Sequence, residues 1–94
     1  MQNKEPLFCQ GAVRGTPGAV KAMAEAKANG YALLFRHVTG DWTEMDEEDQ
    51  QANRLAVEEG GRVFSAYYLS SGVKIWIITE ADRNMTTFLL PEEY

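Results

Sequence analysis

Residues 73–94, VKIWIITEADRNMTTFLLPEEY, decide the fold, because they combine the densest apolar run of the chain with a charged connection and a proline. Residues 74–79 are rich in β-branched and aromatic side chains, which favour a pleated strand. Their alternation places Ile75 and Ile77 on one face and Trp76 and Ile78 on the other. Because both faces are apolar, the stretch predicts a central strand that is covered on both sides.

The segments on either side of this strand predict two further strands. The short polar residues 80–84 favour a turn, and residues 85–90 read as a return strand that ends at Pro91. Upstream, residues 62–69 alternate as a strand, and residues 70–72, Ser-Ser-Gly, form a short hairpin connection. The three strands are therefore expected to form an antiparallel meander.

Helix signals precede the meander. Thr16 followed by Pro17 is typical of a helix start, and good helix formers continue over residues 19–28 until Asn29-Gly30. A longer helix is expected over residues 43–59, with Thr43 as its N-cap and Gly60-Gly61 as its end. Its inward stripe would contain Met45, Asp49, Ala52 or Asn53, and Ala56.

Residues 31–38, YALLFRHV, are ambiguous, because periodicity alone does not assign a short apolar run. The basic residues Arg36 and His37 followed by Gly40 favour a helix with a glycine cap, while a strand that is apolar on both faces stays the alternative. The fold class is α+β: two or three N-terminal helices covering a three-stranded antiparallel β-meander. Residues 1–15 are expected to be a loose N-terminal arm, and residues 16–94 a single domain.

Size and composition suit a cytoplasmic protein. A chain of 94 residues can bury one core without metal or disulfide staples. Cys9 is the only cysteine, so no intramolecular disulfide forms, which fits a reducing compartment. No window approaches the roughly 20 apolar residues of a membrane span, and the N-terminus lacks the apolar core of a signal peptide. We therefore expect a soluble cytoplasmic protein with no membrane partner.

The formal net charge of -5 is unevenly distributed. Residues 1–40 carry five cations and two acids, a net charge of +3, whereas residues 41–94 carry four cations and twelve acids, a net charge of -8. Binding to nucleic acid depends on cations that replace counterions along the phosphates. No direct nucleic-acid binding is expected, whereas an acidic surface could attract a basic groove on a protein.

Several stretches resemble a known family: GDW at 40–42, SAY at 65–67, WIITEADR at 76–83, TT at 86–87 and LLPEEY at 89–94. The chain resembles widespread small bacterial proteins that are labelled plasmid-related or uncharacterised, some of which carry the label of a type I restriction enzyme modification subunit. The resemblance covers most of the chain from Thr16 onward. It implies a bacterial cytoplasmic setting and carriage on mobile genetic elements, and it brings no established activity.

The candidate catalytic residues are His37 and Asp41, because an imidazole beside a carboxylate can act as a general base. The alternative is a structural role, in which His37 ends a helix and contacts its carbonyl groups or its dipole. One histidine and one cysteine, far apart, do not make a metal site, and no cofactor motif is present.

Arg83 has two competing interpretations. Together with Glu80 and Asp82 it could grip a ligand through its planar guanidinium group. Alternatively, it could form a structural pair with Asp49 on the inner face of the long helix, since a buried carboxylate needs a cation. The structural pair is the favoured interpretation.

The leading functional hypothesis is a non-enzymatic accessory or modulator protein that binds an unidentified protein partner through an acidic surface containing Glu44, Glu47 and Glu48. The alternative is a small enzyme or small-ligand-binding protein that uses His37, Asp41, Glu80 and Arg83. A third expectation is a homo-oligomer that pairs through an open sheet edge, because three strands leave two edges unpaired.

Overall fold

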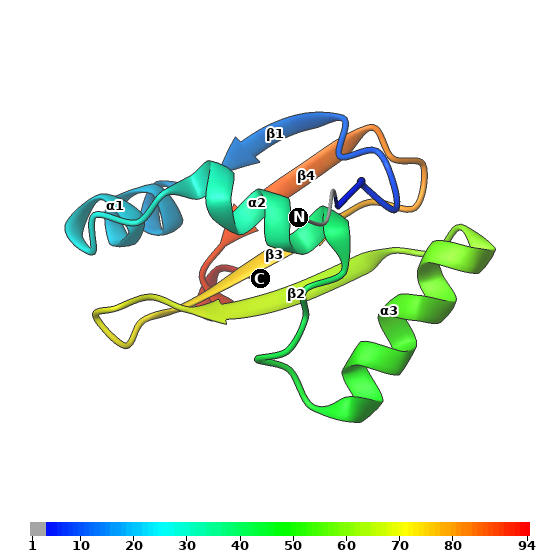
Figure 1. The fold of residues 1–94 in the computed structure, drawn as a ribbon. Coiled ribbons are helices and arrows are strands. Elements are labelled where there is room, and N and C mark those ends of the chain that lie inside the picture. Colours follow the sequence, from blue (N-terminus) through cyan, green and yellow to red (C-terminus); the bar gives the residue numbers. More distant parts are fainter. Residues whose placement is uncertain (1–3) are drawn as a thin grey trace.

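The computed structural model describes residues 4–94, which form three α-helices and one four-stranded mixed sheet (Figure 1). Along the chain the elements are β1 (Ala12–Gly15), α1 (Pro17–Glu25), α2 (Gly30–Thr39), α3 (Glu47–Glu59), β2 (Val63–Tyr68), β3 (Lys74–Thr79), β4 (Met85–Leu89) and the 3-10 turn η1 (Pro91–Glu93). Across the sheet the strand order is β1-β4-β3-β2. The α+β class is therefore confirmed.

The C-terminal meander forms as predicted. Strands β2 and β3 are antiparallel with Val63 opposite Thr79, and β3 and β4 are antiparallel with Ile77 opposite Phe88. Residues 80–84 make the connection, in which Arg83 adopts a left-handed φ of 63°. The β-branched run of residues 74–79 thus forms a strand with a neighbour on each side.

The sheet has a fourth strand that the sequence reading did not predict. Residues 12–15, which were expected to belong to a loose arm, form β1 and pair in parallel with β4, with Val13 opposite Thr86. All four residues of β1 are exposed, so the segment lacks the apolar alternation by which strands are recognised. It is a strand because the outer edge of β4 offers it hydrogen-bonding groups. Residues 1–3 of the predicted arm lie outside the described residues.

Helix α1 starts at the cap that the sequence predicts, whereas Asn29, which was expected to end the first helix, caps α2. The Thr16 side chain accepts a hydrogen bond from the N–H of Ala19, and α1 ends at Glu25, three residues before the expected end. Residues 31–38 lie in a helix and not in a strand, because α2 is capped by Asn29 at its start and by Gly40, with φ 84°, at its end.

The start of α3 was predicted wrongly. The N-cap is Asp46, whose carboxylate accepts from the N–H of Asp49, and the first helical residue is Glu47. Thr43 lies instead in a turn between Trp42 and Met45, which are both buried. Burial of these two apolar side chains stabilises the turn, so the helix begins only at Glu47.

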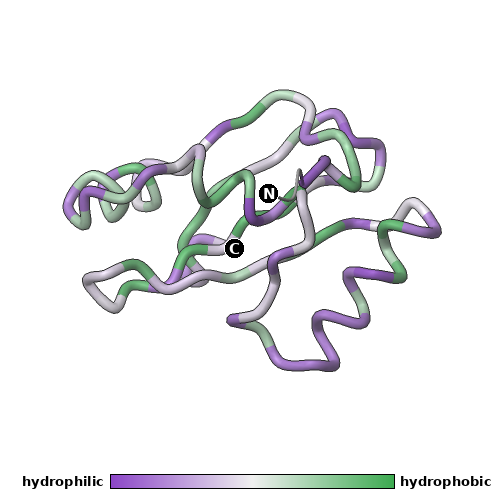
Figure 2. The backbone as a smooth tube through the Cα atoms, in the orientation of Figure 1, coloured by the Kyte–Doolittle hydropathy of each residue, from purple (hydrophilic) through white to green (hydrophobic). Residues whose placement is uncertain are grey.

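The helices occupy two positions relative to the sheet. Helices α1 and α2 cover one face, where they pack on Tyr67, Ile75, Ile77 and Phe88, and α3 lies beside β2 (Figure 1). Most of α3 is hydrophilic, in keeping with a helix at the side of the sheet (Figure 2). On the opposite face Trp76 is only half-buried. No helix within residues 4–94 combines the length and the apolar character that crossing a membrane requires.

Candidate functional site

His37 lies in the core and is fully buried. Its Nδ1 contacts the hydroxyl of Ser65 on β2, and its Nε2 lies 2.9 Å from the hydroxyl of Thr79 on β3. His37 lies in the last turn of α2, as predicted, but neither ring nitrogen contacts the carbonyl groups of that turn. The histidine instead joins α2 to two strands of the sheet.

The hydrogen-bond chain around His37 fixes its tautomer. The Thr86 hydroxyl donates to the carbonyl oxygen of Gln10 at 2.7 Å, so at 2.6 Å it accepts from the Thr79 hydroxyl. The Thr79 oxygen then accepts from the Nε2–H of His37, and Nδ1 is left to accept from the Ser65 hydroxyl. Burial lowers the pKa of His37 to about 3, so the imidazole is neutral at neutral pH.

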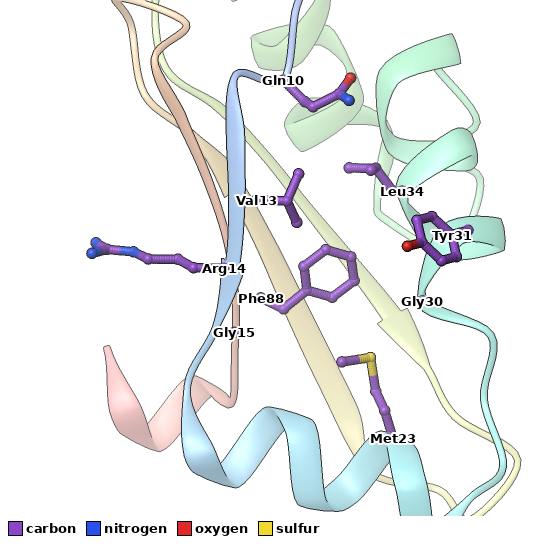
Figure 3. A pocket seen from close by; sticks show the side chains of 9 residues that line it. All are labelled: Gln10, Val13, Arg14, Gly15, Met23, Gly30, Tyr31, Leu34 and Phe88. Atoms are coloured by element: carbon purple, nitrogen blue, oxygen red, sulfur yellow. The ribbon is translucent and has the colours of Figure 1, made fainter.

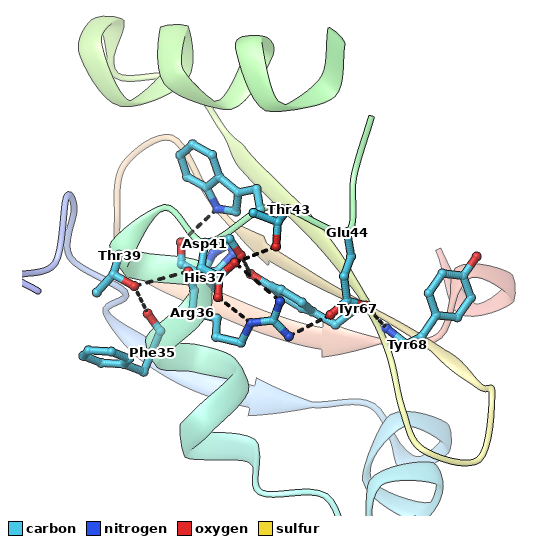
Figure 4. A network of polar contacts seen from close by, with 10 residues as sticks. Phe35, Arg36, His37, Thr39, Asp41, Thr43, Glu44, Tyr67 and Tyr68 are labelled. Carbon is cyan, nitrogen blue, oxygen red and sulfur yellow. Dashed lines mark hydrogen bonds and ion pairs between the residues drawn. The ribbon is translucent and has the colours of Figure 1, made fainter. Parts of the chain in front are cut away.

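Asp41 does not pair with His37, contrary to the catalytic hypothesis. Its carboxylate accepts from the Nε–H of Arg36 at 2.8 Å and from the hydroxyl of Thr43 at 2.9 Å (Figure 4). The hydrogen bond from Arg36 keeps the pKa of Asp41 below its usual value. The Arg36 guanidinium also lies 4.6 Å from the ring centre of Tyr67, whose pKa burial raises to about 12. This cluster fixes the end of α2 on the sheet.

Glu44, one of the predicted binding residues, has two internal partners. One carboxylate oxygen accepts from Arg36 at 2.7 Å, and the other accepts from the backbone N–H of Tyr68 at 2.8 Å (Figure 4). Further along the same strand, the Asn53 side chain donates to the Phe64 carbonyl oxygen at 2.6 Å and accepts from the Phe64 N–H at 3.1 Å. Side chains from the α3 region therefore close the outer edge of β2 at both ends.

The expected pair between Asp49 and Arg83 does not form. Asp49 is exposed on the first turn of α3, and the buried polar residue of that helix is Asn53, one turn later. The guanidinium of Arg83 donates to the carbonyl oxygens of Gly61 at 2.6 Å and Ala56 at 3.2 Å, at the end of α3. Arg83 therefore stabilises the C-terminus of α3, where the helix dipole favours a cation, and needs no carboxylate.

The remaining predicted binding residues lie on separate surfaces. Glu80 is within 3.4 Å of Arg62, and the Asp82 carboxylate accepts from the N–H of Asn84 within the same turn. Glu47 pairs with Arg54 on the exposed side of α3, and Glu48 is exposed beside it.

His37, Asp41, Glu80 and Arg83 do not converge on a common cavity. The ring of Phe8 separates the imidazole of His37 from the guanidinium of Arg83, at 5.2 Å from the first and 5.3 Å from the second. Among residues 4–94, no three His, Cys, Asp or Glu side chains are grouped closely enough to hold a metal ion. The described polar residues thus serve the fold and leave no assembled catalytic set.

A cavity lies elsewhere, between β1 and α2 (Figure 3). This apolar groove has a volume of about 440 Å³ and is lined mainly by Val13, Gly15, Met23, Tyr31, Leu34 and Phe88, with Gln10 at one end. Val13 and Tyr31 are 47% and 85% exposed, so the groove opens to solvent. Its size falls within the range of ligand-binding pockets.

The groove adjoins an unpaired strand edge. The N–H groups of Ala12 and Thr16 donate to the carbonyl oxygens of Asn84, just before β4, and Phe88. By alternation, the backbone groups of Val13 and Gly15 point away from the sheet. Within residues 4–94, no side chain or loop hydrogen-bonds to those outward groups. β1 is therefore the open edge of the sheet, in contrast to β2, whose edge Asn53 and Glu44 close.

Sequence reasoning missed the groove because its walls come from four separate elements, β1, α1, α2 and β4. One signal was present: Tyr31 and Phe35, four residues apart, form an apolar stripe on α2 that is distinct from the buried stripe containing Val38. Two apolar stripes on one short helix indicate a second packing surface.

No protein-family model, curated protein or solved structure matches the chain.

Proposed function

We propose that this protein is a non-enzymatic protein-binding module that acts as an accessory or modulator of a protein partner. The observation that carries the proposal is the exposed apolar groove beside the open edge of β1. Monomeric proteins rarely leave contiguous apolar surface and strand edges uncovered, and such surfaces mark interaction sites.

The dispersal of the polar residues favours binding over catalysis. A general base has to reach a substrate, whereas His37 is fully buried and both of its ring nitrogens have hydroxyl partners. Asp41 is held by Arg36, and Arg83 is held by backbone carbonyl groups. These contacts weigh against the alternative of a small enzyme that uses His37, Asp41, Glu80 and Arg83.

The groove is also a better candidate than the acidic surface. Glu44 has two internal partners, Asp46 caps α3 and Glu47 pairs with Arg54, so much of the acid run is engaged locally. Glu48 and Asp49 lie exposed and add to a negative surface that would repel acidic partners. The resemblance to plasmid-related proteins adds the expectation that the partner is a bacterial or mobile-element protein.

Affinity capture from bacterial lysate tests the proposal. The Tyr31→Ser variant removes an exposed aromatic side chain from the groove, and Leu55→Ser removes an exposed apolar side chain from α3 as a matched control. We expect partners captured by the wild-type protein to be lost from Tyr31→Ser and retained by Leu55→Ser. Loss only after Glu47→Lys and Glu48→Lys would assign binding to the acidic surface instead.

A further inference from the structure

We propose that the groove binds an extended segment of a partner protein, which adds to β1 as a fifth strand and carries an acidic residue between two apolar residues. The inference rests on the proposed protein-binding function and specifies the chemistry of the partner. Three features of the molecule support it: the backbone of β1, the groove and the charge of Arg14.

The backbone of β1 selects an extended occupant. Val13 and Gly15 each present an N–H and a C=O to solvent, two residues apart, which is the repeat that an added strand satisfies. A neighbouring strand would lie roughly 4.8 Å from β1, at the mouth of the groove.

The groove selects apolar side chains at alternate positions of that strand. Val13 points toward α2, as the close-up of the groove shows (Figure 3). Residues directly beside one another on neighbouring strands point to the same face, so the partner residues beside Val13 and Gly15 would also point toward α2. The position of a side chain at Gly15 is taken by Val20, whose methyl group lies 3.0 Å from where a Cβ would stand. A residue beside Gly15 would therefore contact Val20 and the groove residue Met23. Met23 has a flexible thioether that can adapt to different apolar shapes.

Arg14 selects the residue between them. Arg14 lies between Val13 and Gly15 on β1, and its side chain points to the face of the sheet opposite the groove (Figure 3). Its Nε donates to the Thr87 hydroxyl at 3.0 Å, and within residues 4–94 no carboxylate lies within ion-pair distance. Among the other arginines of residues 4–94, Arg36, Arg54 and Arg62 each have a carboxylate partner, and Arg83 is held by backbone carbonyl groups. A carboxylate directly across from Arg14 on the added strand would give this guanidinium an ion-pair partner.

The same geometry disfavours a second copy of this chain as the occupant. If two β1 edges paired antiparallel so that both Val13 and Gly15 were used, Val13 would face Gly15 of the other copy. Arg14 would then face its own copy in a closely spaced pair, and like charges directly opposite are destabilising. Charge complementarity therefore favours a different chain with an acid at that position.

The proposal is tested with two fluorescein-labelled peptides, Gly-Thr-Val-Glu-Leu-Thr-Gly and the same sequence with lysine for glutamate. Fluorescence polarisation with the full-length protein measures the two affinities. We expect the glutamate peptide to bind about fivefold tighter, since one exposed ion pair is gained and one repulsion is avoided. The Arg14→Glu variant should reverse this preference, and Arg54→Glu on α3 should leave it unchanged.

A backbone variant tests strand addition separately from charge. Val13→Pro removes one outward N–H and leaves the bonds of β1 to β4, because proline is tolerated on an edge where the N–H faces solvent. Val13→Thr keeps both the N–H and the branched shape. We expect Val13→Pro to abolish binding of the glutamate peptide and Val13→Thr to weaken it less than threefold, with circular dichroism confirming that both variants fold.

Several results would overturn the inference: no binding of either peptide, equal binding of both, or a charge preference that Arg14→Glu leaves intact. A dimer in sedimentation experiments that Val13→Pro dissociates would assign the edge to a second copy. If a captured partner is lost from Tyr31→Ser but retained by Val13→Pro and Arg14→Glu, the protein-binding function stands and strand addition is wrong.

Discussion

The side-chain amide of Asn53 hydrogen-bonds to both backbone groups of Phe64, as a neighbouring strand would. At the other end of β2, the carboxylate of Glu44 accepts a hydrogen bond from the backbone N–H of Tyr68. These contacts protect one edge of the sheet without covering it with backbone. No side chain of residues 4–94 protects the open edge of β1 in this way, and this asymmetry is the structural basis of the proposed function.

Replacing Asn53 should destabilise the protein and expose the edge of β2. We expect Asn53→Ala to lower the free energy of unfolding by about 2 kcal/mol, because Phe64 loses two hydrogen bonds at a partly buried site. Urea denaturation measures the change, with Gln51→Ala on the exposed side of α3 as the control. A loss below about 0.5 kcal/mol, the usual range for surface substitutions, would show that Asn53 does not close the edge.

Acidification should destabilise the protein through His37. The pKa of His37 is about 3 in the folded state and about 6.5 in an unfolded chain, so the unfolded state binds more protons between these values. The contribution of the neutral histidine is fully present above pH 6.5 and is lost as the pH falls toward 3. We expect the free energy of unfolding to be about 2 kcal/mol lower at pH 5 than at pH 7.5.

The control for this pH dependence is His37→Gln, which removes the titrating group. Urea denaturation from pH 7.5 to 5 should show a nearly flat profile for the variant and a falling one for the wild-type protein. Nitrogen-15 NMR of the wild-type imidazole should show a protonated Nε2 and an unprotonated Nδ1 down to pH 5. Protonation of both nitrogens near pH 6.5 would contradict the buried position of His37.

Arg83 should stabilise α3 independently of Asp49. Arg83→Gln removes charged hydrogen bonds to Gly61 and Ala56, so we expect a loss of about 2 kcal/mol in the free energy of unfolding. Asp49→Asn should change stability little, since Asp49 is exposed. In a double-mutant cycle the two effects should add, and a coupling energy above about 0.5 kcal/mol would mean that the two side chains do interact.

The C-terminal half of the fold could be predicted from sequence because its signals are local. Residues 74–79 are β-branched and aromatic, the polar turn follows directly, and the return strand ends near Pro91. Local signals also located the start of α1 at Thr16 and the helical state of residues 31–38.

The errors lie where tertiary contacts decide between local alternatives. Thr43 and Asp46 are both good N-caps, and burial of Trp42 and Met45 selects Asp46. Asp49 and Asn53 share one helix face, and only Asn53 reaches the sheet. β1 is defined by its partner strand, so the strand could not be predicted from local sequence. For the groove beside it, the sequence offers only the second apolar stripe on α2.

Site-specific photo-crosslinking in bacterial cells tests the protein-binding surface most directly. A benzoylphenylalanine residue would replace Tyr31 in the groove, Leu55 on α3 or Glu48 in the acid run, one position at a time. We expect a discrete cross-linked partner band from position 31 and none from positions 55 and 48. Cross-links from position 48 or 55 in the absence of any from position 31 would contradict binding through the groove.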